Sequence, residues 1–193
     1  MIGDGFFIRN SKFEILNSLY APLVVVLLRL VWALIRSRFK PRINVLDEAA
    51  VTMRVWPNDL DLNVHVNSGR YVSMMDIGRV EILGRMRLLR KVFGRGWRPM
   101  VGATTIRYRR SLLPFQRFTV RTRILCWDAK WLYFRHVIDC RGEVAAVAYV
   151  RGLLRGKEGN VTPAQILALA GKPDLQSPPM PEDIVRWLAV DVR

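Results

Sequence analysis

The sequence predicts an α+β fold in which an antiparallel sheet of about five strands packs against one long helix. Apolar residues recur at helical spacing from Arg70 to Lys91, which is the best amphipathic helix pattern in the chain. One strand-like segment precedes this helix, and four follow it with only short turn signals between them. Consecutive strands joined by short turns pair with their neighbours, so the sheet is expected to be antiparallel.

The first strand is expected from Ala50 to Trp56, where Val51, Met53 and Val55 alternate with more polar residues. The long helix follows a short polar turn. Its apolar stripe has members three or four residues apart: Tyr71, Met74, Met75, Gly78, Ile82, Met86 and Leu89. A glycine on this stripe has no side chain, so Gly78 can let a strand approach the helix closely.

The remaining strands are expected at Met100–Arg110, Phe118–Trp127, Lys130–Cys140 and Glu143–Leu154. Residues typical of turns separate them. If one hairpin turns at Asp128 and Ala129, Cys126 lies opposite a residue near Ala129 to Trp131, too far from Cys140 for a disulfide. Several strands carry Arg at alternate positions, a pattern typical of a solvated sheet face.

A C-terminal helical extension, residues 157–193, follows the sheet. Its first helix is expected at Asn160–Leu169, because Thr162 can cap the helix and Pro163 suits its first position. The Pro-rich stretch Lys172–Pro181 reads as extended chain, and Glu182–Val190 as a last helix.

Residues 1–40 form a separate N-terminal segment. Leu19–Ile35 is apolar apart from Arg29 and reaches about 25 Å as a helix, a little short of the roughly 30 Å of a bilayer core. Such a helix can span a membrane, lie in the membrane surface or pack on the domain. If it spans, the basic residues from Arg36 to Arg42 predict that the following domain lies on the cytoplasmic side. We therefore expect a membrane-associated protein.

The composition is strongly basic, with 31 Lys and Arg against 16 Asp and Glu, a formal net charge of +15. This balance favours an anionic partner. Because the basic residues are spread along the chain and no nucleic-acid motif is present, lipid headgroups or a phosphate-bearing ligand are better candidates than nucleic acid. Two Cys and two His without ligand spacing predict no metal site, and we expect no cofactor.

The chemistry is expected in the turn between the first strand and the long helix. From Asp59 to Tyr71 the sequence reads Asp-Leu-Asp-Leu-Asn-Val-His-Val-Asn-Ser-Gly-Arg-Tyr. Asn and Ser cap helices, and a helix N-terminus presents unpaired N–H groups to a carbonyl or an anion. Capping alone explains Asn67 better than it explains two carboxylates and a His.

This turn resembles the signature of the 4-hydroxybenzoyl-CoA-type acyl-CoA thioesterases, whose pattern is roughly Asp-x-Asp-x-x-Gly-His-Val-Asn-Asn-x-x-Tyr. The similarity extends weakly to Arg151 and is closest to a membrane-associated, thioesterase-like branch. It implies a hot-dog fold over residues 46–156, in which a curved sheet wraps round a central helix, and a homodimer or higher oligomer with the cleft at the subunit boundary. Two positions depart from the pattern: Val64 stands where Gly is usual, and Ser68 where a second Asn is common.

The resemblance implies hydrolysis of acyl-CoA thioesters, with Asp61 as nucleophile or general base and His65 beside it. N–H groups near Val64 and His65 are candidates for holding the oxyanion, although Val64 has a Cβ and disfavours the positive φ that Gly adopts. Asn67 is expected to cap the helix and Tyr71 to line the substrate site.

Arg109 and Arg110, at a strand end, are the candidates for binding the phosphates of CoA, because Arg suits phosphate. An alternative function stays open. The Val64 departure favours a hot-dog domain with weak or no turnover, acting as a membrane-associated acyl-binding or scaffold protein.

Overall fold

The computed structural model describes the backbone of residues 11–191 and the side chains of residues 25–190. Its centre is an antiparallel sheet with the order β1-β3-β4-β5-β2, to which β6 is added through β5. The strands are β1 Ala49–Arg54, β2 Arg98–Tyr108, β3 Arg117–Trp127, β4 Leu132–Cys140, β5 Glu143–Gly156 and β6 Gly159–Val161. β1 and β2 are therefore the two edges of the main sheet.

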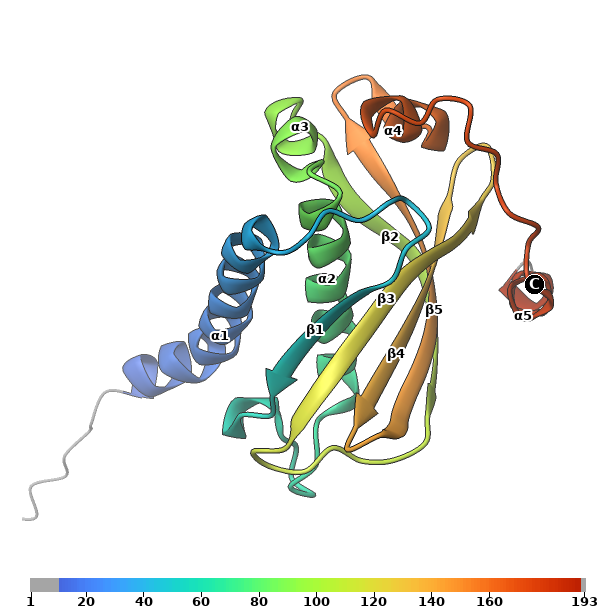
Figure 1. Ribbon diagram of the computed structural model, residues 1–193. Coiled ribbons are helices and arrows are strands. Elements are labelled where there is room, and N and C mark those ends of the chain that lie inside the picture. Colours follow the sequence, from blue (N-terminus) through green and yellow to red (C-terminus); the bar gives the residue numbers. More distant parts are fainter. Residues whose placement is uncertain (1–10, 192–193) are drawn as a thin grey trace, which may run out of the picture.

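Figure 1 shows a layered arrangement, with α2 (Ser68–Arg85) against the curved sheet and α1 (Ser11–Phe39) packed outside α2. The helix α5 (Glu182–Asp191) lies on the other side of the sheet, and α3 (Leu89–Gly94) and α4 (Pro163–Leu169) lie together at one end. A curved antiparallel sheet around a long helix is the architecture that the sequence predicts, so the α+β hot-dog prediction is confirmed.

Strand β3 shows why α2 fits so closely on the sheet. Its apolar residues alternate inward, and Thr122 is buried on the same face. A Cβ added to Gly78 of α2 would lie 2.2 Å from Thr122 Oγ1, far inside van der Waals contact. The expected role of Gly78, to let a strand approach the helix, is confirmed.

A buried chain of polar groups also joins α2 to the sheet. His136 of β4 is fully buried; its Nδ1 lies 2.9 Å from Thr122 Oγ1 and its Nε2 lies 3.1 Å from Arg79 Nη1. Arg79 is in turn paired with Asp76. Because a guanidinium only donates, Nε2 must accept and Nδ1–H must donate to the threonine, which fixes a neutral imidazole. Burial, and then the charge of Arg79, hold the pKa of His136 well below its usual value.

The long helix is shorter than predicted. It ends at Arg85 instead of Lys91, and α3 starts separately at Leu89. Between them Arg87 has φ 61°, a left-handed conformation that breaks the helix. Its guanidinium donates to the carbonyls of Ser37 and Lys40, at 2.7 Å and 2.9 Å, at the end of α1. These long-range contacts hold Arg87 in an unfavourable backbone conformation, and nothing in the local sequence predicts them.

The β3–β4 hairpin also differs from the prediction. β4 begins at Leu132, and a bulge between Ile124 and Cys126 places Cys126 opposite Tyr133, beyond the expected Ala129 to Trp131. The extra residue turns Cys126 to the outer face, where it packs with Tyr133 and with Ile184 of α5. Both cysteines are free thiols, as expected.

The C-terminal extension starts with a strand that the sequence does not predict, β6, which pairs with the end of β5. The expected capping by Thr162 is confirmed, because its side chain accepts a hydrogen bond from Gln165 N at 3.3 Å. The helix α5 places Trp187 on the cluster around Cys126 and Tyr133.

The N-terminal helix α1 packs on the domain along residues 25–39. Ala33 and Ser37 are completely buried, and a Cβ on Gly84 of α2 would collide with the Ser37 side chain, so the two helices cross in close contact. Within the part of the chain that the structure describes, no helix is long and apolar enough to cross a membrane. Residues 1–10, and the side chains of 11–24 at the start of the predicted apolar segment, lie outside the described part.

Candidate active site

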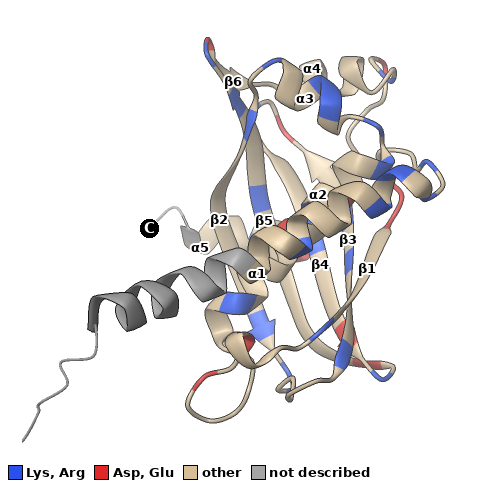
Figure 2. Cartoon of the chain, turned by 90° about the vertical axis from the view of Figure 1, so that its left-hand side faces the viewer, with Lys and Arg blue, Asp and Glu red and all other residues tan. Residues whose placement is uncertain are grey.

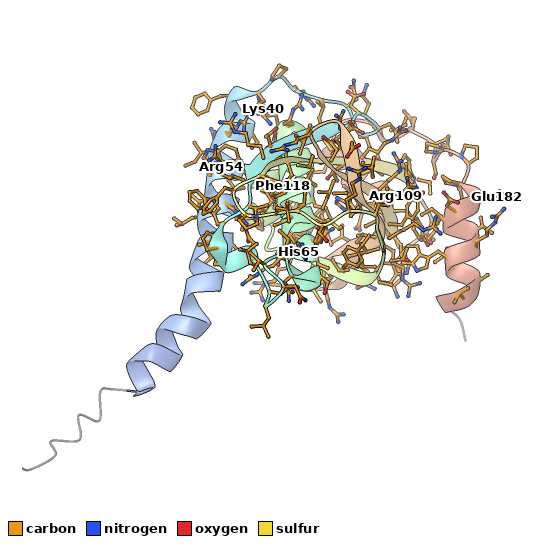
Figure 3. All side chains as sticks on the ribbon, turned by 90° about the horizontal axis from the view of Figure 1, so that it is seen from below. Lys40, Arg54, His65, Arg109, Phe118 and Glu182 are labelled. Atoms are coloured by element: carbon orange, nitrogen blue, oxygen red, sulfur yellow. The ribbon has the colours of Figure 1, made fainter. Side chains whose placement is uncertain are left out.

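A cleft of about 320 Å³ lies where the N-terminal end of α2 meets the end of β2. It brings together five residues that the sequence analysis selects from two distant segments. Its lining consists of Asp61, His65, Val66, Ser68, Tyr71, Tyr108, Arg109, Arg110 and Ser111. Figure 3 views the molecule from below, and His65 and Arg109 lie on the side that faces the viewer.

The wall of this cleft is a tight turn closed by its own backbone. Asp61 N donates to the carbonyl of His65 at 2.8 Å, and Val64 N donates to the carbonyl of Asp61 at 3.1 Å. The turn is then tied to the loop after β2, because Val66 N donates to the Leu112 carbonyl at 3.0 Å. The residues of the turn are therefore held in fixed positions next to the start of α2.

Val64 occupies the left-handed region, with φ 58°. This is the conformation that the glycine of the family pattern would adopt freely, and it is a costly one for a β-branched residue. The turn therefore keeps its shape despite the missing glycine. The Val64 side chain is more than half exposed and is not part of the cleft lining.

The two carboxylates of the turn lie in opposite environments. Asp59 is 1% exposed, receives two hydrogen bonds from Arg29, and accepts a third from Trp56 N at 2.9 Å. Asp61 is half-buried on the cleft wall, and its Oδ1 accepts from Asn63 N at 2.9 Å. Asp59 is thus fully used in holding the turn, which leaves Asp61 as the carboxylate that faces the cleft.

The backbone donors of the turn are not equally available. The N–H of Val64, expected near the oxyanion, is already bonded to the Asp61 carbonyl. The N–H of His65 makes only a long contact, 3.4 Å, with Asp61 Oδ1. A bond of this length is weak, so the His65 N–H is the donor that this turn can most easily give to a ligand.

Asn67 caps α2, as expected: its Oδ1 accepts from Gly69 N at 2.9 Å. Its side chain is therefore occupied by the helix and is not among the residues that line the cleft. Tyr71 is in the cleft and only 2% exposed; burial raises the pKa of its phenol, so the hydroxyl stays protonated at neutral pH.

Tyr108 is a cleft residue that the sequence analysis misses. Its ring packs edge-on against Tyr71 with centroids 5.1 Å apart, and its hydroxyl donates to the Ser68 carbonyl at 3.1 Å. Position 108 lies between two arginines at a strand end, and the alternation of β2 gives no sign that it faces α2. Ser68 and Ser111 also line the cleft, and the sequence analysis does not select either of them as a site residue.

The two candidate phosphate ligands are consecutive residues, and the backbone N–H groups of Arg109 and Arg110 both donate to the Ala145 carbonyl, at 2.8 Å and 3.1 Å. The Arg110 guanidinium is paired with Glu143, whereas the Arg109 side chain is exposed at the cleft rim. No cluster of three or more His, Cys, Asp or Glu that could hold a metal occurs among the described residues.

Residues 55–188 match the model of the thioesterase-like superfamily. A zebrafish (Danio rerio) relative, protein THEM6, is 36% identical over 165 residues, which cover 83% of this chain and 79% of the relative.

Two solved structures share the fold. One is a probable thioesterase from Bartonella henselae, with a TM-score of 0.55, 23% identity, and coverage of 60% of this chain and 98% of that protein. The other is the DHNA-CoA thioesterase of Staphylococcus aureus, with a TM-score of 0.60, 11% identity, and coverage of 76% and 95%.

Proposed function

Because this chain belongs to the thioesterase-like superfamily, we propose that it hydrolyses acyl-CoA thioesters to a free acid and CoA. The observation that carries the proposal is the position of Asp61. Asp61 is the carboxylate of the turn that faces the cleft, whereas both carboxylate oxygens of Asp59 accept hydrogen bonds from Arg29. Hydrolysis of a thioester needs a nucleophile or base at the carbonyl and a donor for the developing oxyanion, and candidates for both lie in the turn before α2.

The proposed reaction places the thioester carbonyl against the N-terminal end of α2, with its oxygen toward the His65 N–H. Asp61 then attacks the carbonyl carbon and expels the CoA thiolate, leaving an anhydride for water to cleave. Alternatively it takes a proton from a water that attacks directly. Both routes use the same carboxylate, and both require it to be ionised. Tyr71 and Tyr108 form the apolar wall beside the reacting group.

Arg109 is the better of the two candidates for a CoA phosphate. Its side chain is exposed at the rim of the cleft, where a phosphate remains partly hydrated. Arg110 would have to exchange Glu143 for the ligand, which reduces its contribution to binding.

We further infer a second subunit along β2. The edge strand β2 exposes Met100 and Val101, and an apolar cavity of about 380 Å³ remains between α2 and the sheet, bounded by residues of β2, β4 and β5. The cavity is also lined by residues of α1, α3 and α4, so the exposed apolar residues of β2 are the feature that supports a dimer. A partner at this edge would border the cleft, because Tyr108 to Arg110 lie at the end of the same strand. A monomer in sedimentation experiments on detergent-solubilised protein would contradict the dimer.

The alternative function is acyl binding without turnover. The departure from the family pattern at Val64 is the sequence feature that favours it. Release of free thiol from a panel of acyl-CoA substrates of increasing chain length separates the two functions. Steady hydrolysis of at least one substrate supports the enzyme; tight binding of acyl-CoA without hydrolysis supports the binding protein.

A further inference from the structure

We propose that the outer face of α1, together with the adjoining edge of β1 and the start of β3, docks on the surface of an anionic phospholipid bilayer. This surface lies apart from the candidate active site. It is defined by the exposed apolar residues of α1, which are Leu27, Leu28, Val31, Trp32, Ile35 and Phe39, and by the groove between α1 and β1. The proposal does not depend on the hydrolytic function.

The helix α1 has two apolar faces of which the domain covers one. Ala33 and Ser37 are fully buried, and Leu30 packs against the core on the same side. The six exposed residues lie on the opposite side of the helix, with exposures from 43% for Trp32 to 85% for Phe39. At 100° per residue, positions 27, 31 and 35 follow one another along a single stripe, with 28, 32 and 39 beside it. Such a contiguous exposed apolar stripe marks an interaction surface.

The groove beside this stripe has a volume of about 890 Å³ and combines aromatic, aliphatic and basic side chains. Trp32 and Leu28 of α1 face Trp56 and Met53 across it. Its cations are Arg29, Arg36, Arg54 and Arg117, and no Asp or Glu is among the residues that line it. Figure 3 shows Arg54 beside α1, away from Arg109.

The charges of this surface identify the partner. Arg29 is already paired with Asp59, but Arg36 is exposed and stacks on the Trp32 ring at 4.7 Å, and Arg54 and Arg117 are exposed at the paired ends of β1 and β3. Figure 2 shows α1 in front, with basic residues on it and on nearby strands. Apolar and tryptophan side chains ringed by arginines fit the interface of a bilayer with anionic headgroups.

The geometry also indicates how this part of α1 meets the membrane. One side of the helix is committed to α2 and to the Arg29–Asp59 pair, so lipid can surround only the other side. For residues 25–39 the structure therefore favours a helix lying along the membrane surface, with the domain above it.

The first experiment measures partition of the purified full chain onto vesicles of neutral phosphatidylcholine and onto vesicles containing 30% phosphatidylserine, with detergent removed by dialysis. The ratio of the two partition coefficients isolates the electrostatic part. The triple variant Arg36→Gln, Arg54→Gln, Arg117→Gln should lower this ratio by about fivefold per arginine, roughly 10²-fold in all. The control triple Arg90→Gln, Arg98→Gln, Arg155→Gln removes the same charge from exposed sites away from this surface and should change the ratio much less.

The second experiment reports contact at this surface itself. Brominated acyl chains quench tryptophan emission only at close range, so wild-type fluorescence should fall on brominated vesicles. The variant Trp32→Phe with Trp56→Phe should lose most of this quenching, whereas Trp187→Phe, on the other side of the sheet, should keep it. Equal effects of the two arginine triples, or quenching that does not depend on Trp32 and Trp56, would overturn the proposal. So would self-association without lipid that Leu28→Ser with Ile35→Ser abolishes, because the surface would then belong to a second copy of the chain.

Discussion

The guanidinium of Arg29 donates to both carboxylate oxygens of Asp59, at 2.8 Å and 2.6 Å, across 30 positions of sequence. Arg29 is the single charge of the apolar N-terminal segment, and Asp59 is almost completely buried at the base of the candidate active-site turn. The pair therefore connects α1 to the turn that carries Asp61. It also gives the charge in the apolar helix a partner within the protein.

The variant Arg29→Ala should be strongly destabilised, because it leaves the buried Asp59 carboxylate without its counter-ion. Breaking one partner of a buried pair costs about 3–5 kcal/mol. Urea unfolding of the variant and of the control Arg38→Ala, an exposed position on the same helix, measures the difference; the control should stay within about 0.5 kcal/mol of wild type. Equal stabilities would show that the pair contributes nothing.

Removing residues 1–40 should have a similar effect for the same reason. It takes away Arg29 and also Lys40, the partner of the buried Glu81, together with the buried Ala33. The sequence pattern alone suggests the opposite. Because its strands begin only near Ala50, it predicts that the domain folds without residues 1–40.

His136 should make the protein lose stability in mild acid. The unfolded chain binds a proton at this imidazole near pH 6.5, whereas burial keeps the folded pKa well below that value, so acid favours the unfolded state. The stabilisation is complete above about pH 6.5 and is lost as the pH falls toward the folded pKa. Denaturant unfolding from pH 7.5 to 5.5 should show this slope in wild type and in His65→Gln, but not in His136→Gln.

Gly78→Ala should be destabilised by about 1–3 kcal/mol, because the added methyl group would collide with Thr122 and push α2 off the sheet. The control Gly94→Ala adds the same methyl group where nothing lies within 4 Å. Thermal unfolding of the two variants compares them directly. If Gly78→Ala is as stable as Gly94→Ala, α2 does not pack on β3 as closely as described.

Val64→Gly should stabilise the protein by about 1 kcal/mol, since glycine adopts φ 58° without the strain that valine suffers. The control Leu62→Gly, in the same turn but without a positive φ, should be destabilised slightly by the added flexibility of the unfolded chain. Chemical denaturation measures both. A destabilised Val64→Gly would mean that the valine side chain makes contacts worth more than the strain. If the valine also limits approach to the oxyanion donor, Val64→Gly should hydrolyse acyl-CoA faster than wild type.

The order of strands and the central helix could be predicted from the sequence because both depend on local periodicity. Val51, Met53 and Val55 alternate as a half-buried strand must, and the stripe from Tyr71 to Met86 is buried as a helix face. Features set by distant contacts could not be predicted. The break at Arg87 depends on carbonyls of α1, and the bulge before Cys126 depends on the partner strand and α5.

The candidate site was predictable in part for the same reason. Asp61, His65 and Tyr71 belong to one short motif, so a resemblance finds them together. Arg109 lies near the end of a predicted strand, and the fold brings that strand end to the motif. Tyr108 was missed, because only the packing of β2 against α2 turns its ring toward Tyr71. The buried pair of Asp59 and Arg29 could not be predicted from the sequence either, since the two residues are 30 positions apart.

The most direct test of hydrolysis by Asp61 is the rate at which Asp61→Asn hydrolyses the best acyl-CoA substrate of wild type, measured as thiol release under saturating substrate. The amide keeps the shape of the carboxylate and its bond to Asn63 N, so folding and acyl-CoA binding should survive. We expect the rate to fall by about 10²-fold or more, because the nucleophile or base is gone. An Asp61→Asn protein that hydrolyses as fast as wild type would contradict it, as would a wild type and a Val64→Gly variant that both bind acyl-CoA and never turn it over.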